Sequence, residues 1–212
     1  MARPSIGSPV DLGDLHKNPL TEFKKWFSLI EKSCEDQPEA MTLATATRKG
    51  IPSARVVLYK GVSPAGFRIF TNLESRKGRE LRANPRAALV FHSKKLNRQI
   101  RIEGQVFPMP RAAVAKYFQT RPRMSQLGAW ASQQSATIPN REALIHRLHH
   151  YEHLFSGKKV SLPDHWGGFL LVPERMEFWI EGEFRLHDRF EYTRTISKSG
   201  KPGPWQRVRL SP

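Results

Sequence analysis

Cysteine is almost absent from this chain, with Cys34 as the single one among 212 residues. One cysteine excludes an internal disulfide and is typical of proteins kept in a reducing compartment. No apolar run approaches the ~18 residues that a membrane-spanning helix needs. The first residues also lack the apolar core of a signal peptide. We therefore expect a cytoplasmic protein without membrane contact, in which Cys34 is structural.

Acidic residues are also scarce, and several nucleotide-binding motifs are missing. There are 19 acidic residues against 35 lysines and arginines, which gives a formal net charge of +16. This excess attracts polyanions and small phosphorylated ligands alike. The chain contains no glycine-rich dinucleotide fingerprint, no Walker-type loop and no internal repeat. Because the basic residues are spread rather than grouped in a block, small phosphates are favoured, and a nucleic-acid-binding module is the alternative.

The composition that is present indicates a globular protein with a core. Hydrophobic residues make up 39% and aromatic residues 10% of the chain, which argues against disorder. Residues 1–17 carry Pro, Gly and Ser without periodicity, and are expected to form a flexible N-terminal arm. Residues 18–212 are expected to form a single domain.

Helices are predicted where cap residues precede apolar residues at helical spacing. Asn18 is an N-cap with Pro19 at the first helical position, and Ser75 caps a second, short helix. The Ser- and Gln-rich stretch 121–140 is expected to be irregular. The predicted helices cover residues 18–30, 75–83, 110–120 and 142–155.

Short strands joined by tight turns are predicted for most of the remaining chain. Because only a few helices interrupt them, they fit an antiparallel barrel better than a βαβ sheet. The fold class is therefore expected to be mainly β with flanking helices. The predicted strands cover residues 41–47, 52–60, 67–71, 87–92, 99–107, 168–172, 176–179, 185–195 and 206–210.

A charged run near the C-terminus is the first candidate binding site. Arg185, His187 and Arg189 occupy every second position, so an extended chain would place all three on one face. Two guanidinium groups and an imidazole suit a planar anionic ligand, because arginine binds phosphate bidentately and stacks on rings. A solvated edge strand with its charges in water is the alternative.

Three further groups of residues could bind phosphate. Arg55 and Lys60 would lie on opposite faces of a regular strand, so they share a ligand only if Lys60 lies past the strand end or a bulge intervenes. Ser75 begins a helix whose free N–H groups favour an anion, and a bound phosphate would account for the adjacent positive charges. A solvated first turn is the alternative. In the third group the side chains lie four residues apart, and a proline interrupts the helical pattern. A helix end followed by a loop must therefore bring these side chains together. The second group is Ser75-Arg76-Lys77, and the third group is Tyr117, Arg121 and Ser125.

Four histidines lie at helical spacing and raise the question of a metal site. No carboxylate or cysteine nearby completes a convincing ligand set, although Glu152 is adjacent in sequence. We therefore expect a solvated basic helix face and no metal. The histidines are His146, His149, His150 and His153.

Trp179 followed by Arg185-Leu-His-Asp-Arg189, together with the Ser-Arg-Lys run at Ser75, closely resembles the pyridoxine (pyridoxamine) 5′-phosphate oxidases, flavoenzymes of vitamin B6 metabolism. The resemblance covers residues 18–212. It implies an antiparallel Greek-key split β-barrel that binds FMN at a homodimer interface, with flavin contacts from both subunits. It also implies oxidation of pyridoxamine 5′-phosphate and pyridoxine 5′-phosphate to pyridoxal 5′-phosphate. In that reaction O2 is reduced to hydrogen peroxide, and ammonia leaves the amine substrate.

The resemblance also implies a role for each site residue. Arg185 and His187 are the expected catalytic residues, because they cover and orient the pyridine ring. The expected substrate-phosphate ligands are Lys60, Tyr117, Arg121 and Ser125. The expected FMN contacts are Arg55, Val56, Val57, Leu58, Lys60, Phe70, Thr71, Arg76, Lys77, Gln99, Gln134, Ser135, Trp179 and Arg189.

Two departures from the family pattern and one rival function qualify this expectation. Phe70 stands where some members carry Tyr, which removes one hydroxyl group. The N-terminal arm offers only Arg3, His16 and Lys17 as basic residues and has no Tyr or Trp, so closure of a lid over the site stays undecided. A flavin split-barrel enzyme with another substrate, similar to the phenazine-pathway enzymes, is the alternative within this fold.

Overall fold

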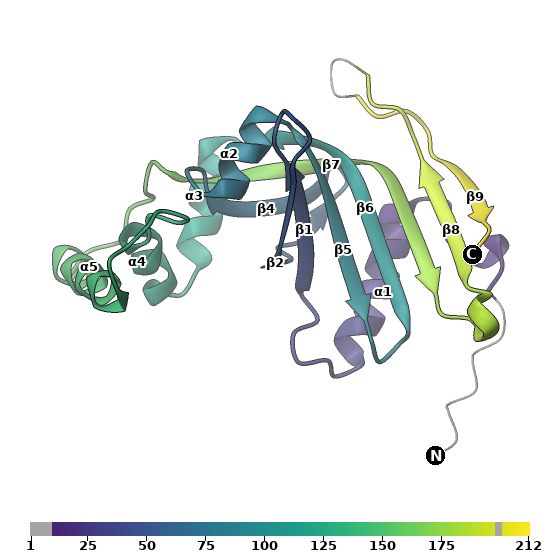
Figure 1. Cartoon of the computed structure of the whole chain (residues 1–212), viewed down its shortest axis with the longest axis horizontal. Coiled ribbons are helices and arrows are strands. Elements are labelled where there is room, and N and C mark those ends of the chain that lie inside the picture. Colours follow the sequence, from purple (N-terminus) through teal and green to yellow (C-terminus); the bar gives the residue numbers. More distant parts are fainter. Residues whose placement is uncertain (1–9, 198–200) are drawn as a thin grey trace.

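The computed structural model describes residues 10–197 and 201–212 and consists of a curved antiparallel sheet with flanking helices (Figure 1). The expected fold class is confirmed. The helices are α1 (Pro19–Lys32), α2 (Arg76–Ala83), α3 (Arg111–Thr120), α4 (Arg123–Ala131) and α5 (Arg141–Leu154), with 3-10 turns η1 (Leu12–Asp14) and η2 (Glu183–Arg185). The strands are β1 (Ala40–Ala46), β2 (Pro52–Leu58), β3 (Val62–Ser63), β4 (Gly66–Asn72), β5 (Arg86–Ser93), β6 (Arg98–Pro108), β7 (Trp166–Ile180), β8 (Asp188–Thr193) and β9 (Gln206–Leu210). Among the helices in these ranges, none is long and apolar enough to cross a membrane.

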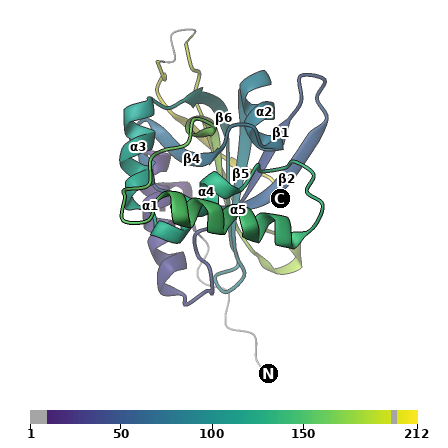
Figure 2. The ribbon, with the colours of Figure 1, turned by 90° about the vertical axis from the view of Figure 1, so that its left-hand side faces the viewer.

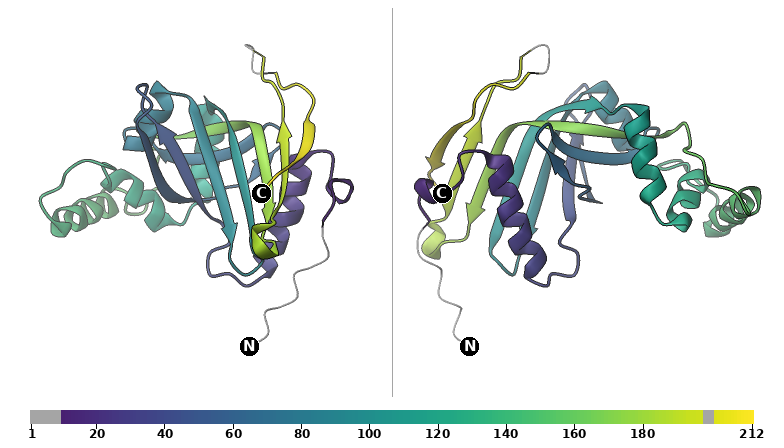
Figure 3. Two further views of the ribbon diagram at one scale, coloured as in Figure 1. Left: turned by 45° about the vertical axis from the view of Figure 1, so that its right-hand side comes forward. Right: turned by 180° about the vertical axis from the view of Figure 1, so that it is seen from behind.

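The sheet divides at β7. The strand order is β2-β1-β5-β6-β7-β4-β3, and β6 follows β7 along nearly its whole length. The other edge of β7 is shared, because its first half pairs with β4 and its second half pairs with β8. The β8–β9 pair therefore lies at the opposite end of the molecule from α4 and α5 (Figure 3).

The main core lies between α1 and the concave face of the sheet. Asn18 caps α1 by accepting a hydrogen bond from the Leu20 N–H at 2.9 Å, as predicted. The helix buries Phe23, whose ring lies edge-on to Phe67 at 4.8 Å and to Phe91 at 5.1 Å. Such aromatic pairs add about 0.5–1.5 kcal/mol each beyond the burial of area. This helix therefore holds β4 and β5 in fixed positions behind the site.

The strands predicted separately over residues 168–172 and 176–179 form one continuous strand, β7. The register between β6 and β7 shifts at Glu103 and Gly104, and Pro173 lies opposite Gly104. An irregular position of this kind accommodates a proline that a regular central strand would exclude. A Cβ atom at Gly104 would lie 2.1 Å from the carbonyl oxygen of Val172, so the close approach of the two strands requires glycine.

The prediction that residues 121–140 are irregular is wrong for the part that forms α4. Pro122 precedes this helix as its N-cap residue, because the fixed φ of proline and its missing N–H are compatible with a helix start. Leu127 and Ala131 are buried on one face of α4. Burial of that face against the neighbouring elements outweighs the weak helical signal of a Ser- and Gln-rich sequence.

The prediction that Arg185, His187 and Arg189 share one strand face is also wrong. Phe184 and Arg185 have φ values of 53° and 66°, which are left-handed and incompatible with an extended chain. The strand predicted over residues 185–195 therefore begins only at Asp188. Arg189 alone of the three basic side chains belongs to a strand.

Residues 10–17 lie against β8 and β9. The Arg207 guanidinium donates hydrogen bonds to two carbonyl groups of this segment at 2.8 and 3.0 Å. The Tyr192 hydroxyl donates to the carbonyl oxygen of His16 at 2.9 Å. This anchored segment differs from the flexible arm expected through residue 17, and residues 1–9 lie outside the described residues.

We predict that Gly104→Ala destabilises the protein. Its Cβ would collide with backbone atoms, which must shift at a cost of about 1–3 kcal/mol, equivalent to a loss of roughly 5 °C in Tm. Thermal unfolding measures this. Gly13→Ala is the matched control, because nothing lies within 4 Å of its added Cβ. Equal Tm values for both variants would contradict the close strand approach.

Candidate functional site

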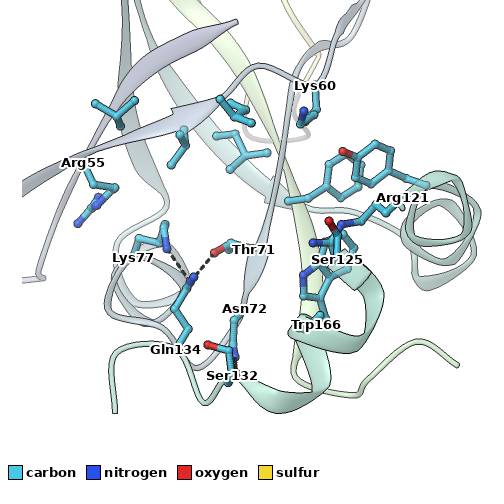
Figure 4. Close-up of a pocket in the computed structure, with 18 residues that line it drawn as sticks. Arg55, Lys60, Thr71, Asn72, Lys77, Arg121, Ser125, Ser132, Gln134 and Trp166 are labelled. Atoms are coloured by element: carbon cyan, nitrogen blue, oxygen red, sulfur yellow. Dashed lines mark hydrogen bonds between the residues drawn. The ribbon is translucent and has the colours of Figure 1, made fainter. Parts of the chain in front are cut away.

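A cavity of about 540 Å³ opens between β2 and β4 on one side and α3 and α4 on the other (Figure 4). Its size suits a small-molecule ligand. Arg55 and Lys77 lie at one end of the cavity, whereas Lys60 and Arg121 lie toward the other. The predicted site residues that line it are Arg55, Val56, Val57, Leu58, Lys60, Phe70, Thr71, Lys77, Tyr117, Arg121, Ser125 and Gln134.

The N-terminus of α2 forms one end of the cavity. Ser75 caps the helix and accepts a hydrogen bond from the Gly78 N–H at 3.2 Å, as predicted. Lys77 Nζ donates to Gln134 Oε1 at 2.7 Å, and Thr71 Oγ1 lies 3.3 Å from the same oxygen (Figure 4). Burial lowers the pKa of Lys77, and the positive charge of Arg55 lowers it further. A cationic helix start of this kind favours an anion.

Glu80 of α2 is a buried carboxylate beside this end of the cavity. Burial raises the pKa of its carboxyl, but hydrogen bonds from Ser53, Thr45 and Arg76, with the charge of Arg76, lower it to about 2. Arg76 Nε donates to Glu80 Oε1 at 2.9 Å, and Arg55 Nη2 lies 3.5 Å from Oε2. One negative charge therefore offsets two arginines that belong to different elements.

The other end of the cavity is aromatic and cationic. Phe70 and Tyr117 stack with ring centroids 3.9 Å apart. The Arg121 guanidinium lies 4.8 Å from the centroid of the Trp166 ring, which is a cation–π distance. Burial raises the pKa of Tyr117, and the charges of Arg121 and Arg68 oppose that rise. The phenol therefore stays a neutral hydrogen-bonding group at physiological pH.

The chain geometry brings together residues that a regular strand or helix would separate. β2 ends at Leu58, so Lys60 lies past the strand end, which is the condition for it to share a cavity with Arg55. Arg121 has an extended ψ of 148° between α3 and α4. This break allows Tyr117, Arg121 and Ser125 to line the same wall.

Arg121 carries a buried donor that is available to a ligand. Its Nη1 atom is buried and has no hydrogen-bond partner in the described part of the chain. Burial lowers the pKa of Arg121, and the neighbouring Tyr117 opposes this. A buried, unpaired guanidinium nitrogen costs free energy that an anionic acceptor would recover. The donor chemistry of this end therefore fits a phosphate group.

The remaining predicted residues do not line this cavity. Arg76 and Ser135 lie beside it, joined by a hydrogen bond of 3.2 Å from the Arg76 N–H to Ser135 Oγ. Another group lies in and around the second half of β7, toward the β8–β9 end, away from α3 and α4 (Figures 1 and 3). That group consists of Gln99, Trp179, Arg185, His187 and Arg189.

Contacts within this second group are specific. Trp179 pairs with Gln99 of β6 and with Arg189 of β8. The His187 ring lies 4.6 Å from the Trp179 ring, and Arg189 Nε donates to Glu177 at 2.8 Å. A single chain therefore carries two groups of predicted site residues at separate places.

Sequence reasoning missed several residues of the cavity and its surroundings. Ser132 precedes a predicted residue pair, and only that proximity signalled it. Glu80 lies in an arginine-rich helix that reads as a surface helix, so its burial was not foreseeable. Arg68 carries a buried Nε atom with no hydrogen-bond partner among the described residues. The cavity residues that were not predicted are Ile69, Asn72, Gly128, Ala129, Ser132 and Trp166.

The four α5 histidines are exposed. Two of them, His146 and His150, line a pocket together with Trp130 and Ala131 of α4, the helix beside α5 (Figure 2). None of the α5 residues is fully buried. Within the described residues there is no group of three or more His, Cys, Asp or Glu side chains that could hold a metal ion.

Two family models match the chain. One is described as "Pyridoxamine 5'-phosphate oxidase" and matches residues 31–155. The other is described as "Pyridoxine 5'-phosphate oxidase C-terminal dimerisation region" and matches residues 166–212. The second match begins with β7 and includes most of the predicted site residues that lie away from the cavity.

Full-length relatives share this similarity. The chain is 47% identical over 208 residues to the pyridoxine/pyridoxamine 5′-phosphate oxidase of Paraburkholderia xenovorans, covering 98% of this chain and 95% of the relative. It is 47% identical over 199 residues to the protein of the same name from Coxiella burnetii, covering 94% of this chain and 98% of the relative.

Two solved structures support the fold. PhzG from Burkholderia lata 383, in complex with tetrahydrophenazine-1-carboxylic acid, has a TM-score of 0.87 at 30% identity, covering 94% of this chain and 95% of that chain. A pyridoxamine 5′-phosphate oxidase-related, FMN-binding protein from Nostoc punctiforme has a TM-score of 0.70 at 16% identity, covering 92% of this chain and 98% of that chain. The second likeness concerns the fold alone.

The Glu80 carboxylate predicts a pH dependence of stability. Because its pKa falls from 4.5 to about 2 on folding, its contribution is present above about pH 5 and lost as the pH falls toward 2. Glu80→Gln should therefore be less stable than the wild type near neutral pH, by about 1–3 kcal/mol, and the difference should shrink on acidification. Urea unfolding at several pH values measures it. A difference that stays constant down to about pH 3 would contradict the assigned charge.

Proposed function

Since the chain belongs to the pyridoxamine 5′-phosphate oxidase family, we propose that it oxidises pyridoxamine 5′-phosphate and pyridoxine 5′-phosphate to pyridoxal 5′-phosphate. FMN is the cofactor, and O2 is the electron acceptor and becomes hydrogen peroxide. The observation that carries this proposal is the buried Arg121 nitrogen of a cationic cavity, which has no hydrogen-bond partner among the described residues. A single cysteine supports a cytoplasmic location for this activity.

The α2 end of the cavity fits the phosphate of FMN. Free N–H groups at the helix start, the Lys77 ammonium group and the Arg76 guanidinium would hold it. Gln134, held by Lys77, supplies an uncharged amide beside this group. When bound, FMN supplies the redox chemistry, because it accepts two electrons from the substrate carbon and passes them to O2.

The α3–α4 end fits the phosphate of the substrate. Arg121 Nη1, the hydroxyl groups of Tyr117 and Ser125, and the Lys60 ammonium group would bind its oxygens. These residues hold a phosphate and do not exchange protons with the reacting carbon. Their contribution is to fix the position of the substrate relative to the cofactor, which lowers the entropic part of the barrier.

We also propose that a second copy of the chain completes the site. The region described as a dimerisation region begins at β7, and it contains Trp179, Arg185, His187 and Arg189, which lie away from the cavity. Phe184 and Leu186 beside them are 90% and 71% exposed, as expected of a surface that a two-fold partner covers. In the dimer, Arg185 and His187 of one copy would orient the substrate ring in the other. Gln99, Trp179 and Arg189 would contact FMN.

Residues 18–212 would act as one domain in this assembly. The two family matches meet between α5 and β7, but β7 pairs with both β4 and β6. The two matched segments therefore share one sheet and one core.

The similarity to PhzG keeps a phenazine-like substrate as a second candidate. The phosphate-binding end favours the B6 vitamers, because a substrate without phosphate would leave Arg121 and Lys60 unneutralised. Identity to the B6 oxidases, at 47%, also exceeds the 30% identity to PhzG.

The purified protein is expected to show flavin absorption bands and to consume O2 with pyridoxamine 5′-phosphate. Product formation is followed by the absorbance of pyridoxal 5′-phosphate. A colourless protein that takes up no FMN, or a flavoprotein that turns over a phenazine precursor but neither B6 vitamer, would contradict the proposed function.

Arg185→Ala is expected to separate substrate binding from cofactor binding. FMN affinity should stay nearly unchanged, whereas kcat/KM for pyridoxamine 5′-phosphate should fall of the order of a hundredfold, because one charge-assisted contact is lost. Arg189→Ala is the control, and its first effect should be a loss of FMN, before any effect on the substrate. If Arg185→Ala gives apoprotein with normal activity after FMN reconstitution, the assigned roles are wrong.

A further inference from the structure

Glu80 joins three elements beneath the α2 end of the cavity. Its side chain is 6% exposed, and it accepts hydrogen bonds from Thr45 of β1 and from Ser53 of β2, the latter at 2.6 Å. Its other oxygen accepts from Arg76 Nε at 2.9 Å. A buried carboxylate with this many donors is held in one position.

Arg55 is fixed by the same group of side chains. Its Nη1 atom donates to the Leu43 carbonyl and to Thr45, and its Nη2 atom donates to Ser53 and lies 3.5 Å from Glu80. With these bonds the guanidinium plane cannot rotate without losing several partners. Arg55 therefore presents a fixed face to the cavity that it lines.

Arg76 is held at one edge only. Its Nε atom is bonded to Glu80, and its two terminal nitrogens have no hydrogen-bond partner among the described residues. Its side chain is 57% exposed and lies in the first turn of α2. A carboxylate that binds the inner edge of a guanidinium leaves the outer edge free for a second, bidentate anion.

We propose that Glu80 is a positioning residue for the cofactor phosphate, which holds Arg55 and directs the free edge of Arg76 toward the anion. This inference rests on the proposed function, because it takes the anion to be the phosphate of FMN. Glu80 itself does not touch the phosphate. Its hydrogen bonds to Arg76, Thr45 and Ser53 hold the two guanidinium groups in position before the anion arrives.

Substitutions at Glu80 can separate the effect of its hydrogen bonds from the effect of its charge. A glutamine has the same shape, accepts from Arg76 through its oxygen, and donates to the two hydroxyl groups, which can reverse their role. Glu80→Gln should therefore keep Arg76 in place, whereas Glu80→Ala removes every bond. A purely electrostatic role would make the two variants behave alike.

The experiment compares FMN with riboflavin, which has the same ring system but no phosphate. Apoprotein is titrated with each flavin by fluorescence, after circular dichroism has shown that each variant is folded. Glu80→Ala should weaken FMN binding about ten- to a hundredfold. Its riboflavin affinity should change by less than about twofold, and Glu80→Gln should bind FMN within about threefold of the wild type.

Two controls make the test specific. Glu74→Ala removes an exposed carboxylate that pairs with Arg82 at 2.9 Å near the start of the same helix, and it should leave both affinities unchanged. In an Arg76→Ala background, Glu80→Ala should weaken FMN binding clearly less than it does in the wild type, because only its effect on Arg55 remains.

Each outcome decides between the alternatives. An equal loss of FMN and riboflavin affinity in Glu80→Ala would mean a general structural role and would overturn the proposal. Additive effects of the Arg76 and Glu80 substitutions would also overturn it. Wild-type protein that binds neither flavin would refute the proposed function itself, whereas wild-type binding with no effect of Glu80→Ala would refute only the role of Glu80.

Discussion

The gathering of positive charge around one cavity is the constraint on which the rest of this structure depends. The cavity is lined by four basic residues, Arg55, Lys60, Lys77 and Arg121. Like charges that line one cavity repel each other. The chain offsets part of this repulsion with the buried Glu80 carboxylate. Arg121 keeps a donor without a partner in the described part of the chain, so the folded cavity still needs an anion at that end. Under the proposed function, two phosphorylated ligands, a cofactor and a substrate, would meet this need at its two ends.

The divided sheet determines where these charges lie. β7 pairs with β4 at its first half, next to the cavity, and with β8 at its second half, next to Trp179 and Arg189. Because β7 is one extended strand, its two halves stay apart, and no change of side-chain conformation can bring the two groups of residues together. A site that uses both groups must therefore combine the first half of one chain with the second half of another.

Local signals in the sequence were sufficient for much of this arrangement. The caps Asn18 and Ser75 were predictable because a cap depends only on neighbouring residues. The four-residue spacing of Tyr117, Arg121 and Ser125, with Pro122 between the last two, predicted a break that lets all three line one wall. The fold class followed from short strands and turns, and the family resemblance supplied residues such as Gln134 that have no local signal.

Other features depend on contacts that a single sequence does not display. The left-handed conformations at Phe184 and Arg185 occur in residues other than glycine, so nothing local predicted that the turn after Gly182 extends through Arg185 and breaks the alternation. Glu80 stands among arginines in a helix that reads as solvated, and only the packing of α2 beside β1 and β2 buries it. Tertiary contacts made from distant parts of the chain decide both cases.

The claim that two copies share each site is tested most directly with purified heterodimers that carry different tags on the two chains. One heterodimer combines an Arg121→Ala chain with an Arg185→Ala chain, and the other combines a doubly substituted chain with a wild-type chain. If the site is shared across a two-fold axis, the first heterodimer has one intact site and about half of the wild-type activity, whereas the second has almost none. The opposite result, with activity only in the second heterodimer, would show that each site is built within one chain.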